Sequence, residues 1–316
     1  MSPRVSVVIV CMNRPDNLCP CLESIERHTT LSHEVLVVAY LFDNAELAKV
    51  KSAFPHVSFI ESDQIRGFSE NNNLALRQAK GEYILCLNDD TLLTEAMIDS
   101  LVADFDKLPS DAAILSPAIR FTDGRLQTCG RPVQTACRYV LERYHLCSNQ
   151  SADDTVGKSP YVDAIYRTSD INGACFMIRR PVFEELGWLD ERYFFTPEDI
   201  ALSTEARKKG YGVYVDAGVS VTHFHHQSAR RIVSATKPAG MRGFLMFYAR
   251  VSAFRYAVLG VCVWLAEWLK YLFCAFRCLF SKEQALHIRK QTYAHCLCSI
   301  FTRKSPKEIF IKYYAR

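Results

Sequence analysis

Two neighbouring carboxylates follow an apolar stretch in the first third of the chain. Residues 82–87 (EYILCL) form the stretch, and Asn88, Asp89 and Asp90 come directly after it. Adjacent carboxylates repel one another. A hard divalent cation, with phosphate oxygens completing its coordination shell, would compensate their charge. A plainer interpretation is a loop in which an aspartate caps a helix beginning near Thr94. The residues alone leave both interpretations open.

A group of histidines lies later in the chain, after another apolar stretch. His223, His225 and His226 occur within residues 223–226, directly behind residues 219–222 (VSVT). Imidazole nitrogens are common metal ligands, whereas a lone histidine at the end of a strand is usually structural. With three histidines so close together, a ligand role and a structural role explain the pattern equally well.

The elements that would position these residues alternate between strands and helices. Short apolar, β-branched stretches predict buried strands, and they are separated by stretches that predict helices. This alternation is typical of a doubly wound, mostly parallel sheet, in which ligands bind beyond the carboxyl ends of the strands. The predicted strands cover 4–11, 34–39, 57–61, 82–87, 112–116, 171–179, 213–215 and 219–223, and the predicted helices cover about 15–27, 69–79, 94–106, a stretch after Pro181, and 198–209.

The stretch from about 120 to 170 breaks this alternation. It is polar and irregular, and includes residues 149–154 (NQSADD) and 157–160 (GKSP). Long connections without an apolar pattern are often functional loops. We therefore expect a long functional loop here rather than a second core.

Three motifs in the amino-terminal half together resemble the inverting glycosyltransferases of family 2, and in particular their rhamnosyltransferase-like branch. They are residues 4–18 (RVSVVIVCMNRPDNL), 67–73 (GFSENNN) and 80–91 (KGEYILCLNDDT), and the resemblance extends over about 4–228. It implies a GT-A fold, which is a Rossmann-like, mostly parallel sheet with helices on both faces. The implied reaction transfers a sugar from a nucleoside-diphosphate donor (dTDP-, UDP- or GDP-linked).

The same resemblance implies a cation site. Asp90 matches the carboxylate that binds Mg²⁺ or Mn²⁺, which bridges the diphosphate of the donor. His223, five residues before Ser228, matches a late His-x-x-x-x-Ser motif of the family and would complete the metal shell or touch the diphosphate.

The donor site implied by the resemblance includes four further residues of these motifs. Asn88 and Asp89 would lie near the ribose and the phosphates. Asn88 stands where the family often has aspartate, which removes one anionic ligand. Asn72 and Asn73 match an asparagine pair near the nucleotide, although a helix amino-terminal turn would also explain them.

The base-recognition part of the donor site departs from the family pattern. Asn13 lies in the segment that resembles the nucleotide-binding loop after the first strand. After the strand of residues 34–38 the family usually has an aspartate that contacts the nucleotide, and here that position is Ala39. Either Asp43 takes over this contact after a small insertion, or the contact is missing.

The acceptor site is implied by two further segments. Glu198 and Asp199 open a helix after Pro197, and acidic residues in the first turn behind a proline are also ordinary helix initiation. In the resembling family this pair lies at the acceptor, where Asp199 would be the general base that takes the proton of the attacking hydroxyl and Glu198 would support it. Residues 172–179 (NGACFMIR) resemble the strand that lines the acceptor pocket, with Asn172 and Gly173 beside the acceptor.

Charge divides the chain into an acidic body and a basic tail. The composition, 49% hydrophobic and 23% charged, excludes a disordered chain. Residues 1–239 hold 25 Lys/Arg and 31 Asp/Glu, a net charge of −6, whereas residues 240–316 hold 13 and 3, a net charge of +10. We expect a GT-A domain over 1–239, with its nucleotide-binding half at about 1–116 and its acceptor half at about 117–239, followed by a basic helical segment over 240–316.

The basic tail contains an amphipathic helix. Residues 256–266 carry no charge but are too few to span a bilayer. At about 100° per residue, Lys270 and Arg277 fall on one arc with Glu267, whereas Trp264 and Trp268 lie opposite. Such a helix suits an anionic membrane surface, although packing on the catalytic domain would also hide its apolar face. With scattered cysteines typical of a reducing compartment, we expect a cytoplasmic protein, peripheral on the inner face of the plasma membrane.

The expected function is the metal-dependent transfer of a sugar to a hydroxyl of a glycan or lipid-linked saccharide in cell-surface polysaccharide synthesis. A polyprenyl-phosphate sugar synthase is one alternative, because its phosphate acceptor needs no base. A catalytically silent module that binds a glycan or nucleotide is another, given Ala39 and Asn88. No nucleic-acid partner is expected, because the basic residues of the tail interleave with aliphatic runs.

Overall fold

The computed structural model describes residues 2–147, 165–224 and 232–314, which form two compact units. The first unit takes in the described residues of 1–133, 150–190 and 198–227, and the second those of 134–149, 191–197 and 228–316. The second unit thus draws on three parts of the chain. The predicted boundary between residues 239 and 240 falls inside helix α8 (Val233–Ala249).

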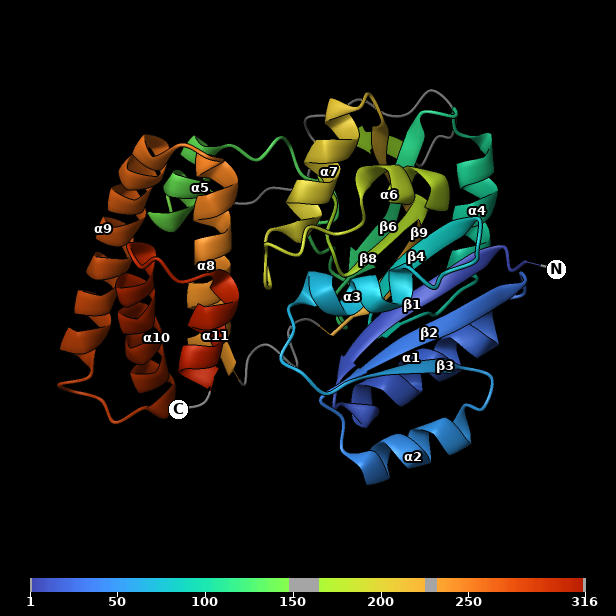
Figure 1. The fold of residues 1–316 in the computed structure, drawn as a ribbon, viewed down its shortest axis with the longest axis horizontal. Helices are drawn as coiled ribbons and strands as arrows, with labels where there is room; N and C mark the ends of the chain where they lie inside the picture. Colours follow the sequence, from blue (N-terminus) through green and yellow to red (C-terminus); the bar gives the residue numbers. More distant parts are fainter. Residues whose placement is uncertain (1, 148–164, 225–231, 315–316) are drawn as a thin grey trace. The chain divides into compact units, whose positions relative to one another are not determined.

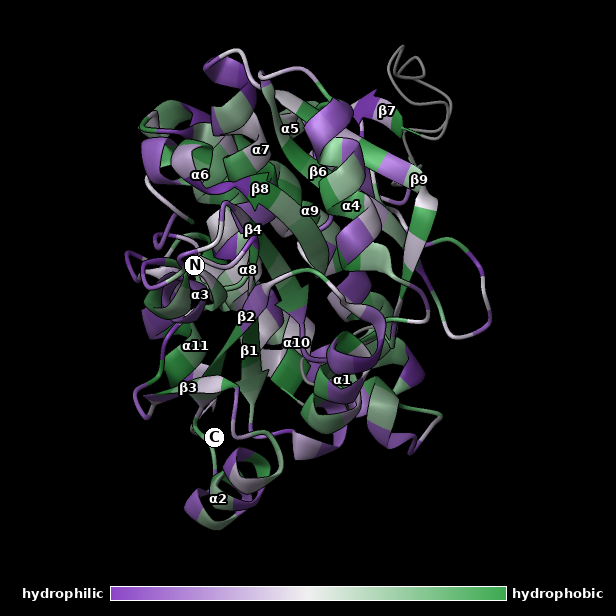
Figure 2. Ribbon diagram, turned by 90° about the vertical axis from the view of Figure 1, so that its right-hand side faces the viewer, coloured by the Kyte–Doolittle hydropathy of each residue, from purple (hydrophilic) through white to green (hydrophobic). Residues whose placement is uncertain are grey.

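The first unit is built on one sheet, whose strand order is β3-β2-β1-β4-β8-β6-β9-β5, with β7 paired to β9 (Figure 1). Its central strands are the most apolar, and Figure 2 shows β1, β4 and β8 mainly in the colour of hydrophobic residues. The strands are β1 (Val5–Met12), β2 (His33–Tyr40), β3 (Ser58–Ser62), β4 (Tyr83–Asn88), β5 (Thr91–Leu92), β6 (Ala112–Arg120), β7 (Ile165–Thr168), β8 (Cys175–Arg179) and β9 (Gly212–His223).

The sheet is mostly parallel, as predicted, but the central strand β8 is reversed. β1, β2, β3 and β4 pair in parallel, as do β6 and β9. β8 lies between β4 and β6 and runs antiparallel to both. A buried strand has the same apolar pattern in either direction, so the sequence could not reveal this reversal. As a result, the beginning of β8 lies at the edge of the sheet where β4 and β6 end.

Helices cover both faces of the sheet, as the family resemblance implied. One hydrophobic cluster includes Leu22 of α1, Val50 of α2 and Phe105 of α4. A second cluster includes Leu76 of α3 and Phe183 of α6, together with residues of α7. The helices are α1 (Pro15–His28), α2 (Asn44–Ala53), α3 (Phe68–Leu76), α4 (Met97–Lys107), α6 (Arg180–Leu186) and α7 (Glu198–Lys208). The unit is therefore an α/β layered domain.

Two predictions for the carboxyl-terminal half of this unit need correction. The stretches 213–215 and 219–223 belong to one strand, β9, whose pairing with β6 shifts register between Pro117 and Ala118. The stretch 120–170, predicted as one loop, contains helix α5 (Ala136–Arg143) and strand β7 within its described residues.

The second unit is helical and has its own small core. Its helices are α5, α8, α9 (Ala253–Arg277), α10 (Gln284–Ile300) and α11 (Pro306–Tyr314). Tyr139, Met241, Leu245, Val263 and Cys296 are buried together in this core. Figure 1 shows α8, α9 and α10 side by side, and these helices pack on one another. The unit therefore holds together by contacts among its own helices.

Helix α9 differs from its prediction in length and in orientation. It runs for 25 residues, past the eleven-residue uncharged stretch, and by length and composition alone it could cross a membrane. The arc with Glu267 and Lys270 was predicted to meet lipid head groups, but Glu267 is fully buried and Lys270 forms an ion pair with it. This charged side of α9 therefore turns toward the other helices of the unit.

Candidate functional site

The carboxyl-end edge of the sheet gathers most of the residues that the sequence singled out. β1 ends before Asn13, β4 ends at Asn88, and β9 ends at His223. The reversed strand β8 brings Asn172 and Gly173 to the same edge, because Ala174 accepts a hydrogen bond from the backbone N–H of Asn88 at 2.9 Å. Donor-site and acceptor-site residues therefore share one edge of the first unit.

Asp90 and His223 are in direct contact at this edge. Nε2 of His223 lies 3.2 Å from Oδ1 of Asp90, and both side chains are buried. The contact arises because Thr91, next to Asp90, is the β5 residue that pairs with His223 in β9. Asn88 is also close, with its Nδ2 at 3.5 Å from Nε2 of the same ring.

Gln127 orients the His223 ring, so that Nδ1 donates a hydrogen bond to Gln127 and Nε2 faces Asp90. The amide nitrogen of Gln127 donates to the backbone oxygens of His223 and Arg120, at 2.8 and 3.3 Å. Its Oε1 therefore faces Nδ1 of His223, at 2.9 Å, and accepts a hydrogen bond from it. In the neutral ring Nε2 then carries a lone pair that points at the Asp90 carboxylate, an arrangement that needs a proton or a cation between the two groups.

These residues fit a divalent cation. A carboxylate oxygen and an imidazole nitrogen are common ligands of divalent metals. In such sites the other nitrogen of the ring is usually held by a hydrogen bond, as Gln127 holds Nδ1 here. Among the described residues no group of three or more His, Cys, Asp or Glu could hold a metal, so Asp90 and His223 would hold the cation with substrate or water oxygens as the other ligands. The remaining predicted histidine-motif residues, His225, His226 and Ser228, lie outside the described residues.

Asp89, next to Asp90, is also buried. The pKa of Asp89 is raised to about 7, mainly by burial and also by the Asp90 charge, whereas a hydrogen bond from Cys11 opposes the shift. Its Oδ2 has no hydrogen-bond partner. A buried carboxylate of this kind is costly unless positive charge is brought to it, which agrees with the cation site beside it.

The other predicted donor-site residues make contacts within the protein. Oδ1 of Asn13 accepts the backbone N–H of Asp43 at 3.1 Å, which joins the loops after β1 and β2. Asp43 caps α2, because its Oδ1 accepts the backbone N–H groups of Ala45 and Glu46. Asp43 thus has a structural role as a helix cap, made by one of its two carboxylate oxygens.

The asparagine pair of α3 is buried. The amide of Asn73 donates to the Leu189 backbone oxygen at 2.9 Å and accepts the Leu189 N–H at 3.1 Å. Asn72 donates to the backbone oxygen of Phe68, one turn earlier in the helix. Asn73 thus clamps a distant backbone segment, so the structure gives it a structural role that the sequence motif did not indicate.

Asp199 is held by Arg131, which belongs to none of the sequence motifs. Nη2 of Arg131 lies 2.7 Å from Oδ2 of Asp199, and the two side chains are 13% and 15% exposed. Arg131 also donates to the backbone oxygen of Ile171. Oδ1 of Asp199 accepts the N–H of Ile200 at 2.7 Å, close to the amino terminus of α7. These contacts fix the carboxylate in one orientation.

Glu198 is buried next to Asp199. Burial, and then the neighbouring Asp199 charge, raise the pKa of Glu198 well above its usual range. Its Oε2 has no hydrogen-bond partner. Glu198 therefore holds its proton under conditions in which an ordinary glutamate is ionised.

Gly173 forms the boundary between this acidic pair and the end of β4. A Cβ at Gly173 would lie 3.5 Å from Cβ of Asp199 and 3.6 Å from Oε1 of Glu198, and its N–H points at Oδ2 of Asp199 over 3.4 Å. The side chain of Asn172 is tied to the backbone of Thr128 and Ala174. The loop before β8 thus lies against Glu198 and Asp199. Because Gly173 has no side chain, it does not cover these two acids.

Arg131 and Gln127 have no motif that could have revealed them. Both lie in the polar stretch after β6, where single polar residues are frequent. Their roles depend on contacts with residues that are distant in the sequence. Gln127 contacts His223 of β9, nearly a hundred residues later in the chain, and Arg131 contacts Asp199 of α7.

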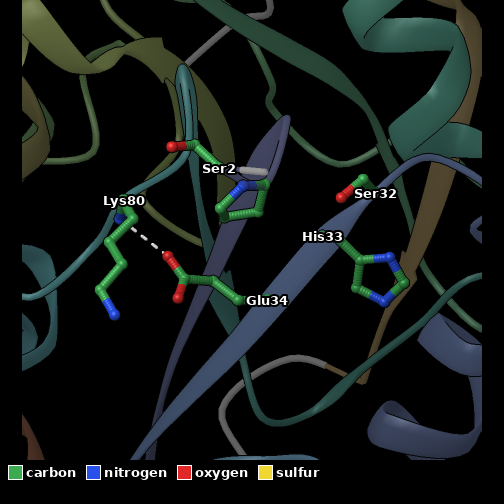
Figure 3. Close-up of a pocket in the computed structure, with 6 residues that line it drawn as sticks. Ser2, Ser32, His33, Glu34 and Lys80 are labelled. Atoms are coloured by element: carbon green, nitrogen blue, oxygen red, sulfur yellow. Dashed lines mark hydrogen bonds between the residues drawn. The ribbon is translucent and has the colours of Figure 1, made fainter.

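A separate hollow lies at the opposite edge of the sheet (Figure 3). It has a volume of about 580 Å³ and is lined by Ser2, Pro3, Ser32, His33, Glu34 and Lys80. The backbone N–H of Lys80 donates to Glu34 across it, at 2.7 Å. His33 begins β2, so the hollow lies at the amino ends of the strands, and none of the predicted site residues lines it.

Several curated relatives of this chain are named as glycosyltransferases or as an O-antigen biosynthesis protein. The chain is 25% identical over 242 residues to the O-antigen biosynthesis protein RfbC of Myxococcus xanthus, a match that covers 75% of this chain and 18% of that protein. It is 25% identical over 232 residues to the N-acetylglucosaminyl-diphospho-decaprenol L-rhamnosyltransferase of Mycobacterium tuberculosis, covering 67% of this chain and 74% of the relative. An uncharacterised glycosyltransferase of Bacillus subtilis, YwdF, is 30% identical over 118 residues, which cover 36% of this chain and 43% of the relative.

Solved structures share the fold at low sequence identity. The mannosyltransferase PcManGT of Pyrobaculum calidifontis, in complex with GDP-Man and Mn²⁺, has a TM-score of 0.52 and 15% identity, and the match covers 95% of this chain and 86% of that one. GalNAc-T7 with UDP, GalNAc and Mn²⁺ has a TM-score of 0.54 and 16% identity, covering 75% and 51%. These likenesses confirm the GT-A fold.

A family model matches more than half of the chain. The model described as "Glycosyl transferase family 2" matches residues 6–187, which include nearly all of β1, the Asn88–Asp90 segment and β8. Glu198, Asp199 and His223 lie beyond the matched region. Because the match covers more than half of the chain, the chain belongs to glycosyl transferase family 2.

Proposed function

We propose that this protein is a metal-dependent inverting glycosyltransferase, which moves a sugar from a nucleoside-diphosphate sugar to a hydroxyl of a glycan or a lipid-linked saccharide. The observation that carries the proposal is that the Asp90–His223 pair and the Glu198–Asp199 pair belong to one edge of the sheet, linked through Gly173, Ala174 and Asn88. A transfer reaction needs a donor-phosphate site and a proton acceptor close together.

The donor side of the proposal rests on Asp90 and His223. A divalent cation held by these residues would neutralise charge on the diphosphate of the donor and so make the nucleoside diphosphate a better leaving group. Gln127 keeps the acceptor nitrogen of His223 turned to the cation. The Mn²⁺ in the structures with GDP-Man and with UDP supports the choice of Mg²⁺ or Mn²⁺.

The acceptor side of the proposal rests on Asp199. A hydroxyl that attacks the anomeric carbon must lose its proton, and Asp199 takes it as general base. Arg131 orients the Asp199 carboxylate, and the neutral acid Glu198 donates a hydrogen bond to the acceptor. Attack from the acceptor side, opposite the leaving diphosphate, inverts the configuration at the anomeric carbon.

The class of acceptor is inferred from the relatives. One is named for a lipid-linked saccharide acceptor, N-acetylglucosaminyl-diphospho-decaprenol, and another for O-antigen synthesis. A role in cell-surface polysaccharide synthesis fits both names. We infer an acceptor hydroxyl, because a phosphate acceptor would leave the ordered Arg131–Asp199 pair without a proton to accept.

Transfer from a panel of dTDP-, UDP- and GDP-sugars, with Mg²⁺ or Mn²⁺, tests the proposal. A short soluble glycan serves as acceptor, and the configuration of the product bond is read by NMR. Transfer should require the cation, stop in EDTA and be lost in Asp90→Ala, whereas Glu184→Gln, at an exposed acid of α6, should stay active. Full activity of Asp90→Ala in EDTA would exclude the cation site. Transfer to polyprenyl phosphate that survives Asp199→Asn would favour the sugar-phosphate synthase instead.

A further inference from the structure

Helix α9 exposes a long apolar stripe. Phe254, Val258, Val261, Leu265, Leu272 and Phe276 are between 42% and 77% exposed. Their spacing of three, four or seven residues is that of one face of an α-helix. Water-exposed helices normally turn charged residues outward, so an outer face made of aromatic and aliphatic side chains marks an interaction surface.

Two charged residues in the middle of α9, Glu267 and Lys270, lie on the inner side instead. Glu267 is fully buried, and its carboxylate lies 2.9 Å from Nζ of Lys270, 3.6 Å from Nζ of Lys237 and 3.8 Å from Nε of Arg143. Lys237 comes from α8 and Arg143 from α5. The buried charge of Glu267 is thus compensated by cations from helices of the same unit, whereas the apolar side chains of the stripe remain exposed.

Exposed cations flank the apolar stripe at both ends. Arg250 and Arg255 lie at the amino-terminal end of α9, and Arg277 and Lys282 at the carboxyl-terminal end. The surrounding stretch, residues 240–316, carries 13 Lys/Arg against 3 Asp/Glu. An apolar face bordered by cations is the pattern of a helix that binds an anionic lipid surface.

The neighbour of α9 argues against a membrane-spanning arrangement. At 25 residues α9 is long enough to span, but α10 packs along it. α10 carries exposed His287, Arg289 and Gln291. If α9 crossed the hydrocarbon, these polar side chains would enter it with α9, at a high cost.

We propose that α9 lies in the plane of a membrane interface, with its outer stripe inserted among the lipids and the other helices of its unit on the water side. The partner is a bilayer that contains anionic lipids. A second copy of the chain fits less well, because a symmetric contact presents the same surface twice and would bring Arg255 and Arg277 of both copies together. This inference does not depend on the proposed transfer reaction.

Vesicle flotation with two matched double variants of the full chain tests the surface. Val261→Glu/Leu265→Glu places two charges in the stripe. Ile288→Glu/Ile311→Glu makes the same change of charge at exposed side chains of α10 and α11, which are 40% and 41% exposed. Vesicles contain phosphatidylglycerol and phosphatidylcholine, or phosphatidylcholine alone. Circular dichroism verifies that each variant is folded, and donor turnover with a soluble acceptor is measured in parallel.

The wild type should float with the anionic vesicles and detach as salt is raised. Binding of the stripe variant should fall by about tenfold or more for each side chain, because each loses its apolar burial in lipid, whereas the α10/α11 variant should bind like the wild type. Equal loss in both variants, or none in either, would overturn the proposal. So would a wild type that ignores the vesicles and forms a dimer that the stripe variant breaks. If the wild type binds the vesicles but shows no donor turnover, the result would contradict the proposed transfer reaction and leave the membrane proposal standing.

The depth of insertion separates an in-plane helix from a spanning one. Trp188→Phe leaves Trp264 and Trp268, both on α9, as the emitters. An in-plane helix lies about 5–10 Å into the interface, so lipids brominated near the head group should quench the emission more than lipids brominated near the chain end. Stronger quenching by the deep label would contradict the in-plane arrangement.

Discussion

Arg131 and Asp199 form a nearly buried ion pair, with 2.7 Å between Nη2 and Oδ2. The same guanidinium nitrogen donates to the backbone oxygen of Ile171. Arg131 is therefore anchored to the loop before β8 while it holds the carboxylate that opens α7. Through this pair, a residue of the polar stretch after β6 fixes the orientation of the proposed base.

Arg131 is expected to act as a positioning residue. Arg131→Met should lower kcat for transfer by about tenfold to a hundredfold, because a misplaced base loses much of its effect, while KM for the donor stays close to the wild-type value. Arg131→Lys should recover part of kcat, since an ammonium can still pair with Asp199. Steady-state kinetics with donor varied at fixed acceptor measures both constants.

Two comparisons keep this result interpretable. Removing one partner of a buried pair costs stability on the order of 3 kcal/mol, so urea unfolding accompanies the kinetics. Arg125→Met, which breaks an exposed pair with Asp123, should change neither kcat nor stability appreciably. A donor KM that rises as much as kcat falls would place Arg131 in the donor site.

Glu198 is expected to matter for transfer less than Asp199. Because burial raises the pKa of Glu198 well above its usual range, we expect the side chain to be protonated, and Glu198→Gln keeps its size and a hydrogen-bond donor. Transfer should fall by less than about tenfold, compared with about 10²–10⁴ for loss of a general base. A loss as large as that of Asp199→Asn would make Glu198 the proton acceptor.

The pH dependence of stability checks the state of Glu198 independently. A group whose pKa is raised by folding contributes stability below its unfolded pKa, and this stability is lost as pH rises through the folded pKa. Glutamine cannot ionise, so the Glu198→Gln variant does not lose this stability as the pH rises. The unfolding free energy of Glu198→Gln, relative to wild type, should therefore increase with pH above about 4. A difference that stays constant with pH would contradict a protonated Glu198.

Gln127 is expected to control the affinity for the cation. Gln127→Leu removes the amide that holds Nδ1 of His223, and loss of such an outer hydrogen bond costs about 10–100-fold in metal affinity. Mn²⁺ titration followed by calorimetry, with a nucleoside diphosphate present, gives the constant. Gln78→Leu, at an exposed position just after α3, is the control. Unchanged Mn²⁺ affinity in Gln127→Leu would exclude this role.

Much of the nucleotide-binding half could be predicted from the sequence. Apolar, β-branched stretches such as residues 5–12 become buried strands, and polar residues at their ends gather at one edge, because the strands of this half run in parallel. The motif resemblance implied that Asp90 binds the cation and that His223 either completes the metal shell or touches the diphosphate, and in the structure the two side chains are in contact. Local pattern and family motif were sufficient here.

The rest depended on information that no local pattern contains. The direction of β8 is set by how the chain returns to the sheet, and its apolar pattern is the same either way. Arg131 and Gln127 acquire their contacts from distant elements. For α9, the helical arc of Glu267 and Lys270 was identified, but the side of the helix that turns inward was decided by Lys237 and Arg143, which compensate Glu267 from other helices.

The most direct measurement of the central claim compares transfer and donor binding in Asp199→Asn. The exchange keeps the shape of the side chain but removes its ability to accept a proton. The account predicts that single-turnover transfer falls by about 10²–10⁴, while the Kd for the nucleoside-diphosphate sugar with Mn²⁺ stays within about twofold of wild type. Glu205→Gln, an exposed acid of the same helix, should resemble the wild type in both. Transfer at the wild-type rate by Asp199→Asn, or a parallel loss of donor binding, would contradict the assignment of Asp199 as the base.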